Sequence, residues 1–184
     1  MVKCAGMRRA VFFDKDGVIN KMVDRGSGFM LAGKEVRLTA PWTLDELVIF
    51  EPARRLVTAV KEQGYLAIVI TNQPDVSYGV MKPENLELIL QSVRSLGFDD
   101  LFACFHGRDD NCRCRKPWPG MLLQAAAKWG IALERSFMLG DMDTDAGAAR
   151  AAGCRSVIIH RHYNHDVRCD VRITSYEELL TLLP

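Results

Sequence analysis

The sequence lacks the features that mark membrane-spanning and nucleic-acid-binding proteins. Its apolar runs, such as Leu66 to Ile70, are far shorter than the roughly 20 residues that a membrane-spanning helix needs. It also lacks an excess of charge of one sign: the formal net charge is +1, and no block of lysine and arginine stands out. Binding to nucleic acid through the neutralisation of phosphates is therefore not expected. The predicted partners are small molecules, with no nucleic acid and no membrane.

The composition is that of a folded domain. The 184 residues fall in the usual size range of one domain, and 48% of them are hydrophobic and 26% charged, close to the averages of globular proteins. We expect a single domain over residues 1–184. The first ten residues are too short and too basic for a secretory signal with its own apolar core, so a cytoplasmic location is predicted.

Short apolar runs alternate with longer segments of helical periodicity, a pattern typical of βαβ units and a parallel sheet. The apolar runs are nearly continuous, as expected for strands that helices cover on both faces. The sequence therefore predicts an α/β fold with a doubly wound, Rossmann-like parallel sheet, and no insertion is large enough for a separate cap domain. The predicted strands lie at residues 10–13, 66–70, 101–105, 137–139 and 156–159, and the predicted helices at residues 52–63, 83–96, 119–129, 145–152 and 175–183.

Two segments do not follow this alternation. Residues 20–49 show no clear periodicity, and residues 106–118 carry a group of cysteines. Long loops in compact domains often serve as lids or binding loops. We expect both segments, together with residues 75–82, to cover the site.

Polar residues follow the predicted strands, at the edge where an open parallel sheet binds its ligands. Asp14 and Asp16 follow the first strand, Thr71 ends the second, Lys116 lies beyond the third, and Asp141 follows the fourth. A phosphoryl-transfer site needs a nucleophile, a proton donor, a hard cation and fixed donors for the remaining charge. Asp14 can attack phosphorus, and Asp16 can protonate the leaving oxygen. The carboxylates of Asp14 and Asp141 suit Mg²⁺, and Thr71 and Lys116 can hold phosphate oxygens.

Four short motifs resemble those of the haloacid dehalogenase-like superfamily: Asp14-x-Asp16-Gly17, Thr71-Asn72-Gln73, Lys116, and Gly140-Asp141-x3-Asp145. The resemblance covers nearly the whole chain and implies a Mg²⁺-dependent phosphatase that acts through a phosphoaspartate. It implies that Asp14 is the nucleophile and Asp16 the general acid and base, and that Thr71 and Lys116 stabilise the phosphoryl group. The implied Mg²⁺ ligands are Asp14, the backbone carbonyl of Asp16, and Asp141.

The last motif contains a third carboxylate. Asp143 lies between Asp141 and Asp145, so two spacings are possible. We take Asp141 as the metal ligand and Asp145 as a partner that acts through water or through a neighbouring ligand. Asp143 is expected to face solvent.

The cysteine group has the composition of a structural metal site. The pattern Cys104-x-His106-x5-Cys112-x-Cys114 supplies three thiolates and one imidazole, the ligand set of a four-coordinate Zn²⁺. A zinc-binding loop is therefore predicted at about residues 104–116, where it would fix the position of Lys116. The remaining cysteines are isolated and are expected to be free thiols: Cys4, Cys154 and Cys169.

The phrase from Cys112 to Met121 resembles a narrower group, the capless phosphatases that include heptose 1,7-bisphosphate phosphatase and histidinol-phosphate phosphatase. The resemblance implies that Arg115 contributes to substrate recognition, and Asn72 is the second predicted substrate contact. One position departs from the heptose enzymes, because Tyr78 stands where they usually carry an arginine.

The predicted function is hydrolysis of a sugar phosphate such as heptose 1,7-bisphosphate. The alternatives within enzymes are hydrolysis of histidinol phosphate and transfer of the phosphate from Asp14 to another sugar. A different class is a zinc-stabilised binding module without catalysis.

Two further groups of residues invite a functional interpretation. The segment from His160 to His165 contains three imidazoles, but it follows the fifth strand as a polar loop, so structural or solvent-exposed roles are expected. Of the three tryptophans, Trp118 is the best candidate for a wall of the site, and Trp42 and Trp129 are expected to pack in the interior.

Overall fold

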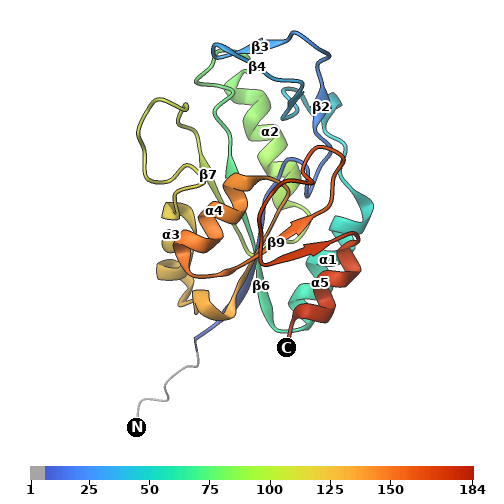
Figure 1. Cartoon of the computed structure of the whole chain (residues 1–184), viewed down its shortest axis with the longest axis vertical. Helices are drawn as coiled ribbons and strands as arrows, with labels where there is room; N and C mark the ends of the chain where they lie inside the picture. Colours follow the sequence, from blue (N-terminus) through green and yellow to red (C-terminus); the bar gives the residue numbers. More distant parts are fainter. Residues whose placement is uncertain (1–6) are drawn as a thin grey trace.

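A six-stranded sheet with the strand order β10-β9-β8-β1-β6-β7 forms the centre of the protein (Figure 1). The structure is a computed structural model and describes residues 7–184. Each strand pairs in parallel with its neighbours, which confirms the predicted parallel sheet. The strands are β1 (Arg9–Phe13), β6 (Tyr65–Asn72), β7 (Asp100–Cys104), β8 (Phe137–Gly140), β9 (Arg155–Ile159) and β10 (Val171–Ile173).

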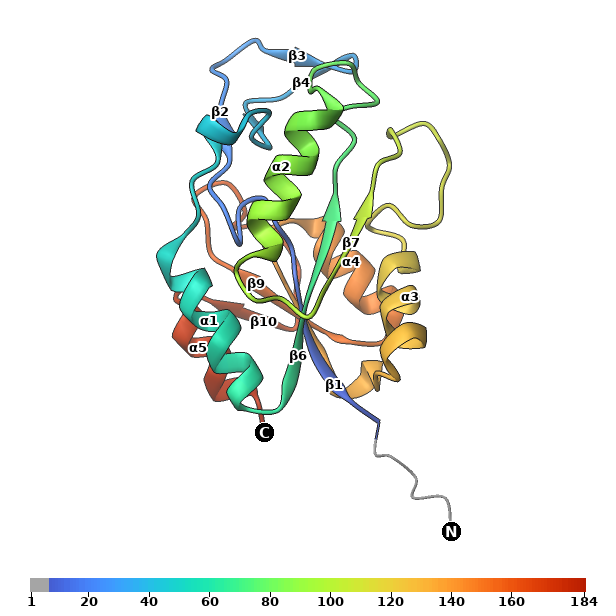
Figure 2. The same cartoon turned by 180° about the vertical axis from the view of Figure 1, so that it is seen from behind.

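Helices cover both faces of the sheet (Figure 2). Because successive side chains of a strand point to opposite faces, β1 divides its side chains between two cores. Val11 and Phe13 pack with α1 and α5, whereas Ala10 and Phe12 pack with α3 and α4. The helices are α1 (Glu51–Glu62), α2 (Pro83–Arg94), α3 (Gly120–Trp129), α4 (Asp143–Ala152) and α5 (Tyr176–Leu182), with short 3₁₀ helices η1 (Leu44–Glu46) and η2 (Leu133–Arg135).

The helix boundaries follow the proline and glycine positions in the sequence. Gly130 and Gly153 end α3 and α4 in the left-handed conformation, which glycine adopts without steric cost. Helix α4 begins two residues before its predicted start, because Met142 is the extended N-cap and Asp145 accepts its backbone N–H at 3.0 Å. None of the described helices is both long and apolar enough to cross a membrane.

Strand β10 was not predicted. It has only three residues, with Arg172 between two apolar ones, so no apolar run marks it. Its position beside β9 depends on a contact outside the strand: the Asp170 carboxylate accepts the backbone N–H of Ser156 at 2.8 Å and its hydroxyl at 2.7 Å.

The segment between β1 and α1 was expected to be a loop and contains two small antiparallel ladders above the carboxyl end of the sheet (Figure 1). One ladder pairs β2 (Val23–Asp24) with β5 (Leu38–Thr39), and the other pairs β3 (Met30–Leu31) with β4 (Lys34–Glu35). The Trp42 indole ties this segment to the turn after β6 by donating to Asp75 Oδ1 at 3.0 Å. We call residues 20–49 the hairpin segment.

The strand order places a switch point at β1. From β1 the chain builds β6 and β7 on one side and later returns to build β8 on the other. In open α/β sheets, ligands bind beyond the carboxyl ends of the strands at such a point. Phe13 pairs with Val69 of β6 and Leu139 of β8, so the next residue, Asp14, lies between two neighbouring strand ends.

Candidate active site

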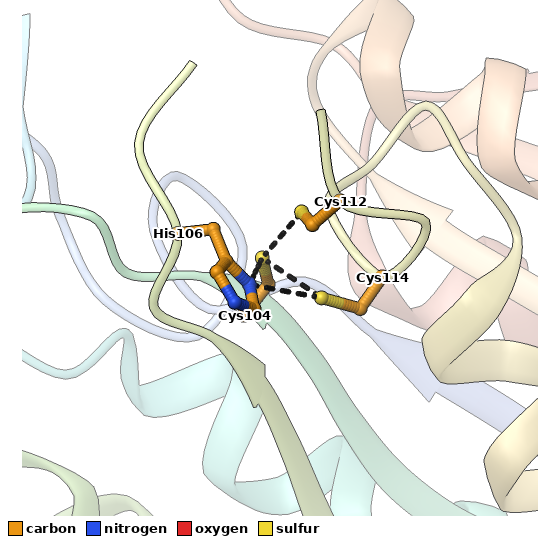
Figure 3. A group of neighbouring side chains, drawn as sticks. All are labelled: Cys104, His106, Cys112 and Cys114. Carbon is orange, nitrogen blue, oxygen red and sulfur yellow. Dashed lines mark hydrogen bonds between the residues drawn. The ribbon is translucent and has the colours of Figure 1, made fainter. Parts of the chain in front are cut away.

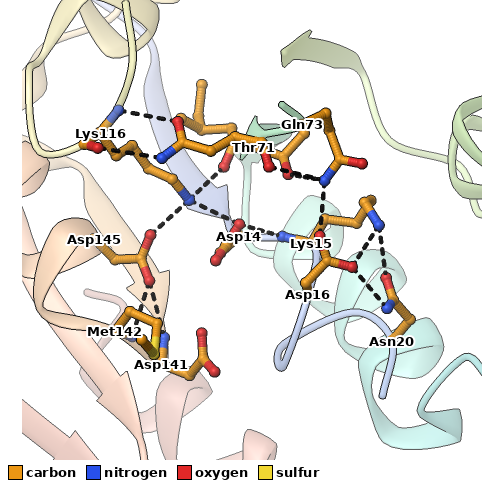
Figure 4. Close-up of polar contacts among 12 residues, drawn as sticks. Asp14, Lys15, Asp16, Asn20, Thr71, Gln73, Lys116, Asp141, Met142 and Asp145 are labelled. Atoms are coloured by element: carbon orange, nitrogen blue, oxygen red, sulfur yellow. Dashed lines mark hydrogen bonds and ion pairs between the residues drawn. The ribbon is translucent and has the colours of Figure 1, made fainter. Parts of the chain in front are cut away.

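The structure brings the polar strand-end residues into one buried group (Figure 4). Asp14 follows β1 and donates its backbone N–H to Leu139 of β8 at 2.9 Å. Asp141 follows β8, and Thr71 ends the buried part of β6. One carboxylate oxygen each of Asp14, Asp141 and Asp145 lies within 4.8 Å of the others. We call these three residues the acidic cluster.

Lys116 is the cation at the centre of this group. Its ammonium forms ion pairs with Asp14 Oδ1 at 2.7 Å and with Asp145 Oδ1 at 2.6 Å, and it donates to the Ile70 carbonyl at 3.0 Å. Burial lowers the pKa of Lys116, but the charges of Asp14 and Asp145 outweigh it and hold the pKa above its ordinary value. The side chain is therefore a permanent positive charge beside the predicted nucleophile.

The acidic cluster carries more negative charge than Lys116 balances. Burial raises the pKa of Asp14 to about 7; the charge of Asp145 adds to this shift and Lys116 opposes it. Burial and the charges of Asp14 and Asp145 also hold the pKa of Asp141 well above its usual range. A divalent cation bound here would relieve this excess charge.

The two oxygens of Asp141 have different surroundings. The Tyr163 hydroxyl donates to Oδ2 at 2.5 Å. Oδ1 is buried and has no hydrogen-bond partner within residues 7–184. A buried carboxylate oxygen without a donor is costly unless a cation binds it, so the donor set of the acidic cluster fits a hard cation such as Mg²⁺.

Asp145 is already occupied by protein donors. Oδ1 pairs with Lys116, and Oδ2 accepts the backbone N–H groups of Asp141 at 3.2 Å and Met142 at 3.0 Å. Both carboxylate oxygens thus have protein partners, and the role of Asp145 as a partner that acts through water or a neighbouring ligand stays a prediction. Asp143 is exposed, as expected.

Three side chains hold Asp16 in place. Lys15, whose side chain is fully buried, and Asn20 donate to Oδ1 at 2.5 and 3.0 Å, and Gln73 donates to Oδ2 at 2.7 Å. Gln73 also donates to the Thr71 hydroxyl at 3.0 Å. Sequence reasoning identified Asp16 and Thr71 but assigned no role to these donors. Their proximity along the chain to Asp16 and Thr71 was the signal that could have found them.

Asn72 was predicted to contact substrate. In the structure, its side-chain amide forms hydrogen bonds with the backbone of Lys116. Its Nδ2 donates to the Lys116 carbonyl at 3.2 Å, and its Oδ1 accepts the Lys116 backbone N–H at 3.0 Å. Asn72 still lines the cavity beside Asp14. The strand end of β6 thus fixes the backbone from which the Lys116 ammonium extends.

The predicted cysteine and histidine ligands lie together in the loop after β7 (Figure 3). His106 Nδ1 lies 3.2 Å from Cys114 Sγ and 3.5 Å from Cys104 Sγ, and Cys104 Sγ lies 3.3 Å from Cys114 Sγ and 3.6 Å from Cys112 Sγ. A tetrahedral Zn²⁺ with bonds of about 2.3 Å to sulfur places its ligand atoms roughly 3.5–3.8 Å apart. The four side chains, which we call the thiol cluster, therefore have nearly the spacing of a tetrahedral metal site.

The chemistry of the thiol cluster also fits a metal. Burial, followed by the hydrogen bond with Cys114, raises the pKa of the Cys104 thiol to about 12. Thiolates at neutral pH would therefore need a positive charge among them, which a bound Zn²⁺ supplies. The loop is packed against α3: a Cβ added to Gly120 would lie 2.3 Å from the Arg113 carbonyl oxygen.

A cavity of about 500 Å³ opens above Asp14 and Asp16. The hairpin segment supplies one wall with apolar side chains, including Leu31, Val36 and Leu38. Two basic residues, Arg108 and Arg115, also line the cavity. Further lining residues are Met22, Thr39, Asn72, Asp75, Tyr78, Lys116 and Met142.

The expected role of Trp118 as a wall of the site is wrong. Trp118 is 60% exposed and lines a separate hollow with Pro119 and Leu123 at the start of α3. Pro117 is the last residue of this loop that lines the cavity above Asp14, and Gly120 packs closely against Arg113. Trp42 is half-buried and is a packing residue as expected, with its ring centroid 5.8 Å from that of Phe29.

The loop after β9 was only partly anticipated. His160, His162 and His165 are exposed, as expected for a polar loop. Tyr163 and Asn164 were missed: both bond to Asp141, through its carboxylate and its backbone carbonyl. No motif marks them, because the contact depends on how β8 and β9 lie side by side.

Comparison with known proteins identifies relatives of this chain. A family model described as HAD-hydrolase-like matches residues 113–167. A D-glycero-beta-D-manno-heptose-1,7-bisphosphate 7-phosphatase of Helicobacter pylori is 35% identical over 144 residues, covering 74% of this chain and 74% of the relative. The Pseudomonas aeruginosa protein of the same name is 30% identical over 158 residues, covering 83% of this chain and 81% of the relative.

The fold has solved counterparts. The D,D-heptose 1,7-bisphosphate phosphatase of B. bronchiseptica, complexed with magnesium and phosphate, superposes with a TM-score of 0.79 at 22% identity, covering 95% of this chain and 97% of that one. The chain belongs to the haloacid dehalogenase-like hydrolases, as its motifs predicted. The two relatives described above, from Helicobacter pylori and Pseudomonas aeruginosa, are named heptose bisphosphate 7-phosphatases.

Proposed function

We propose that this chain is a Mg²⁺-dependent phosphatase that hydrolyses a small sugar phosphate through a phosphoaspartate on Asp14. Its relatives in the haloacid dehalogenase-like family are named phosphatases, which confirms the predicted enzyme class. The observation that carries the proposed mechanism is the buried ion-paired group of Asp14, Lys116 and Asp145. Asp16 follows Asp14 by two residues in the sequence, and a hydrogen bond from Gln73 fixes its carboxylate.

Asp14 would attack the phosphorus atom. Both protein donors to its carboxylate within residues 7–184, the Lys116 ammonium and the Lys15 backbone N–H, bond to Oδ1. Oδ2 is therefore the atom available for attack. The new bond joins Oδ2 to phosphorus, and the bond from phosphorus to the sugar oxygen breaks.

Asp16 would move the protons. Protonated Asp16 gives its proton to the leaving sugar oxygen in the first step. As a carboxylate in the second step, it takes a proton from the water that attacks phosphorus and releases phosphate and free Asp14. The contacts with Lys15, Asn20 and Gln73 hold its carboxylate at one orientation for both steps. Thr71 and Lys116 would hold the oxygens of the transferring phosphoryl group.

Asp14, Asp141 and the backbone carbonyl of Asp16 would hold Mg²⁺. When bound, Mg²⁺ neutralises the charge of the phosphoryl oxygens and of the acidic cluster. The support for this assignment is the buried Oδ1 of Asp141, which has no protein donor within residues 7–184.

The thiol cluster would hold a structural Zn²⁺ through Cys104, His106, Cys112 and Cys114. The ion would fix the loop that ends at Lys116 and would leave no open coordination position for catalysis. Three free thiols so close together also suit a reducing compartment, which supports a cytoplasmic location.

The substrate we favour carries a second anionic group, as heptose 1,7-bisphosphate does. Two guanidinium groups, Arg108 and Arg115, border the cavity, and neither forms an ion pair within the described residues. Tyr78, which replaces the expected arginine, accepts the Arg108 backbone N–H at 2.9 Å. Arg108 can thus supply positive charge to the cavity. The apolar side chains with which the hairpin segment lines the cavity suit the C–H groups of a sugar.

The alternative reactions differ in readily measured ways. Histidinol phosphate carries an ammonium group rather than a second phosphate, and the two arginines disfavour it electrostatically. Transfer to a sugar acceptor would lower the ratio of phosphate released to substrate consumed. A binding module without catalysis would release no phosphate at all.

The experiment is phosphate release from heptose bisphosphates, histidinol phosphate and common sugar phosphates, compared by kcat/KM in the presence of Mg²⁺. We expect the bisphosphate to be the best substrate and Asp14→Asn to lower its kcat by at least about 10⁴-fold. Asp143→Asn is the matched control, since its carboxylate is exposed, and it should keep wild-type turnover. Full turnover by Asp14→Asn would contradict the nucleophile assignment, and a preference for histidinol phosphate would contradict the substrate.

A further inference from the structure

The loop at residues 160–165 holds Asp141 at two points. The Tyr163 hydroxyl donates to the carboxylate Oδ2 at 2.5 Å, and Asn164 Nδ2 donates to the backbone carbonyl at 2.7 Å. The proposed phosphoryl transfer uses neither residue directly. One loop therefore fixes both the backbone and the side chain of a proposed metal ligand.

This loop is itself fixed to the sheet. Asn164 is 2% exposed and also donates to the Ile159 carbonyl at 2.9 Å, while its Oδ1 accepts the Arg161 backbone N–H at 2.8 Å. Arg161 Nε donates to the Gly17 carbonyl at 3.0 Å. These bonds join the loop to the end of β9 and to the turn that follows Asp14.

The hydrogen bond from Tyr163 distinguishes the two carboxylate oxygens of Asp141. Oδ2 has a protein donor, whereas Oδ1 is buried and has no donor within residues 7–184. Because a carboxylate can rotate about its Cβ–Cγ bond, a donor on one oxygen also fixes the direction of the other. Tyr163 thus leaves Oδ1 as the oxygen that can bind a cation.

The backbone of the nucleophile turn fits closely around this hydrogen bond. A Cβ added to Gly17 would lie 2.0 Å from Asp141 Oδ2 and 2.7 Å from the Tyr163 hydroxyl, and Gly17 has φ +86°. A side chain at this position would displace either the carboxylate or the tyrosine. The turn, the carboxylate and the hydroxyl therefore fit together only with glycine at position 17.

We propose that Tyr163 is a positioning residue for the catalytic cation: its hydroxyl orients Asp141 so that Oδ1 faces the acidic cluster. This inference rests on the proposed Mg²⁺-dependent function. Hydrogen-bond partners of metal ligands commonly change metal affinity about 10- to 100-fold when they are removed. The expected signature is therefore weaker cation binding with little change in substrate binding.

The test is Tyr163→Phe, which removes the hydroxyl and keeps the ring. Binding of Mn²⁺, a paramagnetic cation that takes the same oxygen ligands, is measured by the EPR signal of the free ion in Mg²⁺-free, zinc-loaded protein without substrate. We expect the Kd for Mn²⁺ to rise about tenfold or more. The Mg²⁺ concentration that gives half-maximal activity should rise in parallel, while KM for the substrate at saturating Mg²⁺ stays unchanged.

The matched control is Tyr65→Phe. The Tyr65 hydroxyl is buried at the opposite end of the sheet and has no hydrogen-bond partner among residues 7–184, so this variant should bind Mn²⁺ like the wild type. A folded Tyr163→Phe protein with wild-type affinity for Mn²⁺ overturns the proposal. So does a variant whose melting temperature falls without Mg²⁺ while its Mn²⁺ affinity is unchanged, because the hydroxyl then acts only on stability. Wild-type protein that binds no Mn²⁺ would instead contradict the proposed metal dependence itself.

Discussion

The acidic cluster and the thiol cluster are assembled in opposite ways. The thiol cluster comes from one loop, with its first and last ligands at Cys104 and Cys114. The acidic cluster joins Asp14 to Asp141 and Asp145, and their carboxylates meet only because β1 and β8 are neighbours in the sheet. The first can therefore be recognised from local spacing, whereas the second exists only once the sheet has formed.

The two clusters also differ in how they balance charge. The acidic cluster has a protein cation, Lys116, in contact with two of its three carboxylates. The thiol cluster has neutral or weakly acidic groups, and within the part of the chain that the structure describes no lysine or arginine side chain bonds to them. In the acidic cluster, a metal ion would neutralise the negative charge that Lys116 leaves unbalanced. In the thiol cluster, a metal ion would favour the loss of the thiol protons, so that thiolates form and bind it. Lys116 links the two clusters, since it lies two residues after Cys114.

Removing Lys116 should have the largest effect on the acidic cluster. Lys116→Met leaves buried carboxylates without their cation, so kcat should fall roughly 10²- to 10³-fold. The free energy of unfolding in Mg²⁺-free buffer should fall by about 3–5 kcal/mol. Steady-state kinetics and urea unfolding measure the two effects.

Lys21→Met is the control for this prediction, because Lys21 is exposed and should leave both quantities unchanged. If Lys116→Met retained wild-type kcat, Lys116 would have no part in stabilising the phosphoryl group. If the free energy of unfolding also stayed unchanged, Lys116 would not balance part of the charge of the acidic cluster.

Removing a ligand of the thiol cluster should have an intermediate effect on stability. It should also lower activity, although the thiol cluster lies outside the acidic cluster. Cys114→Ser should lose the bound zinc and lower the melting temperature by roughly 5–10 °C, which corresponds to about 2–3 kcal/mol in a domain of this size. Activity should fall as well, since Lys116 loses its fixed loop. Cys169→Ser, which changes an isolated thiol, should keep one zinc per chain and the wild-type melting temperature. Zinc-free protein of unchanged stability would reject the structural role of the metal.

The smallest expected effect is a dependence of stability on pH. Burial raises the pKa of Asp14 from 3.8 to about 7, so between these values the unfolded chain binds fewer protons than the folded one. The free energy of unfolding of Mg²⁺-free protein should therefore fall as pH rises from 5 to 7, by roughly 2 kcal/mol. Mg²⁺ should restore it at pH 8, because it binds the folded state. Urea unfolding with and without Mg²⁺ measures this.

Asp14→Asn should flatten this pH dependence and weaken the response to Mg²⁺, whereas Asp143→Asn should preserve both. If the free energy of unfolding depended on pH identically in wild type and Asp14→Asn, the ionised carboxylate of Asp14 would not destabilise the folded protein.

Much of the fold and of the site could be predicted from the sequence, for a physical reason. Strands covered on both faces leave continuous apolar runs, and polar residues directly after them, such as Asp14 and Asp141, must lie at the ligand-binding edge. Ligand spacing within a single loop marked Cys104 and its three partners. Strand β10 and the short ladders of the hairpin segment escaped because they are two or three residues long and have no periodicity.

The supporting contacts could not be predicted in the same way. Tyr163 lies 22 positions from Asp141, in a polar loop whose composition suggests solvent exposure. Lys15 is fully buried although lysine is seldom buried, because its ammonium reaches Asp16 directly. Trp118 was misassigned because its side chain is exposed and lines a separate hollow at the start of α3. Such contacts depend on side-chain directions that only the folded backbone defines.

The central claim is that Asp14 carries the phosphoryl group during turnover, and chemical trapping tests it most directly. Borohydride reduces an acyl phosphate to an alcohol and would convert phosphorylated aspartate into homoserine, which peptide mass spectrometry locates. An Asp16→Asn variant given an aryl phosphate should accumulate the phosphoaspartate. An aryl oxide leaves without needing a proton from Asp16, so the phosphoaspartate forms, but its hydrolysis still needs Asp16 as the base. We predict homoserine at position 14, formed only when substrate is present. Reduction at another carboxylate, with Asp14 unmodified during turnover, would contradict the claim.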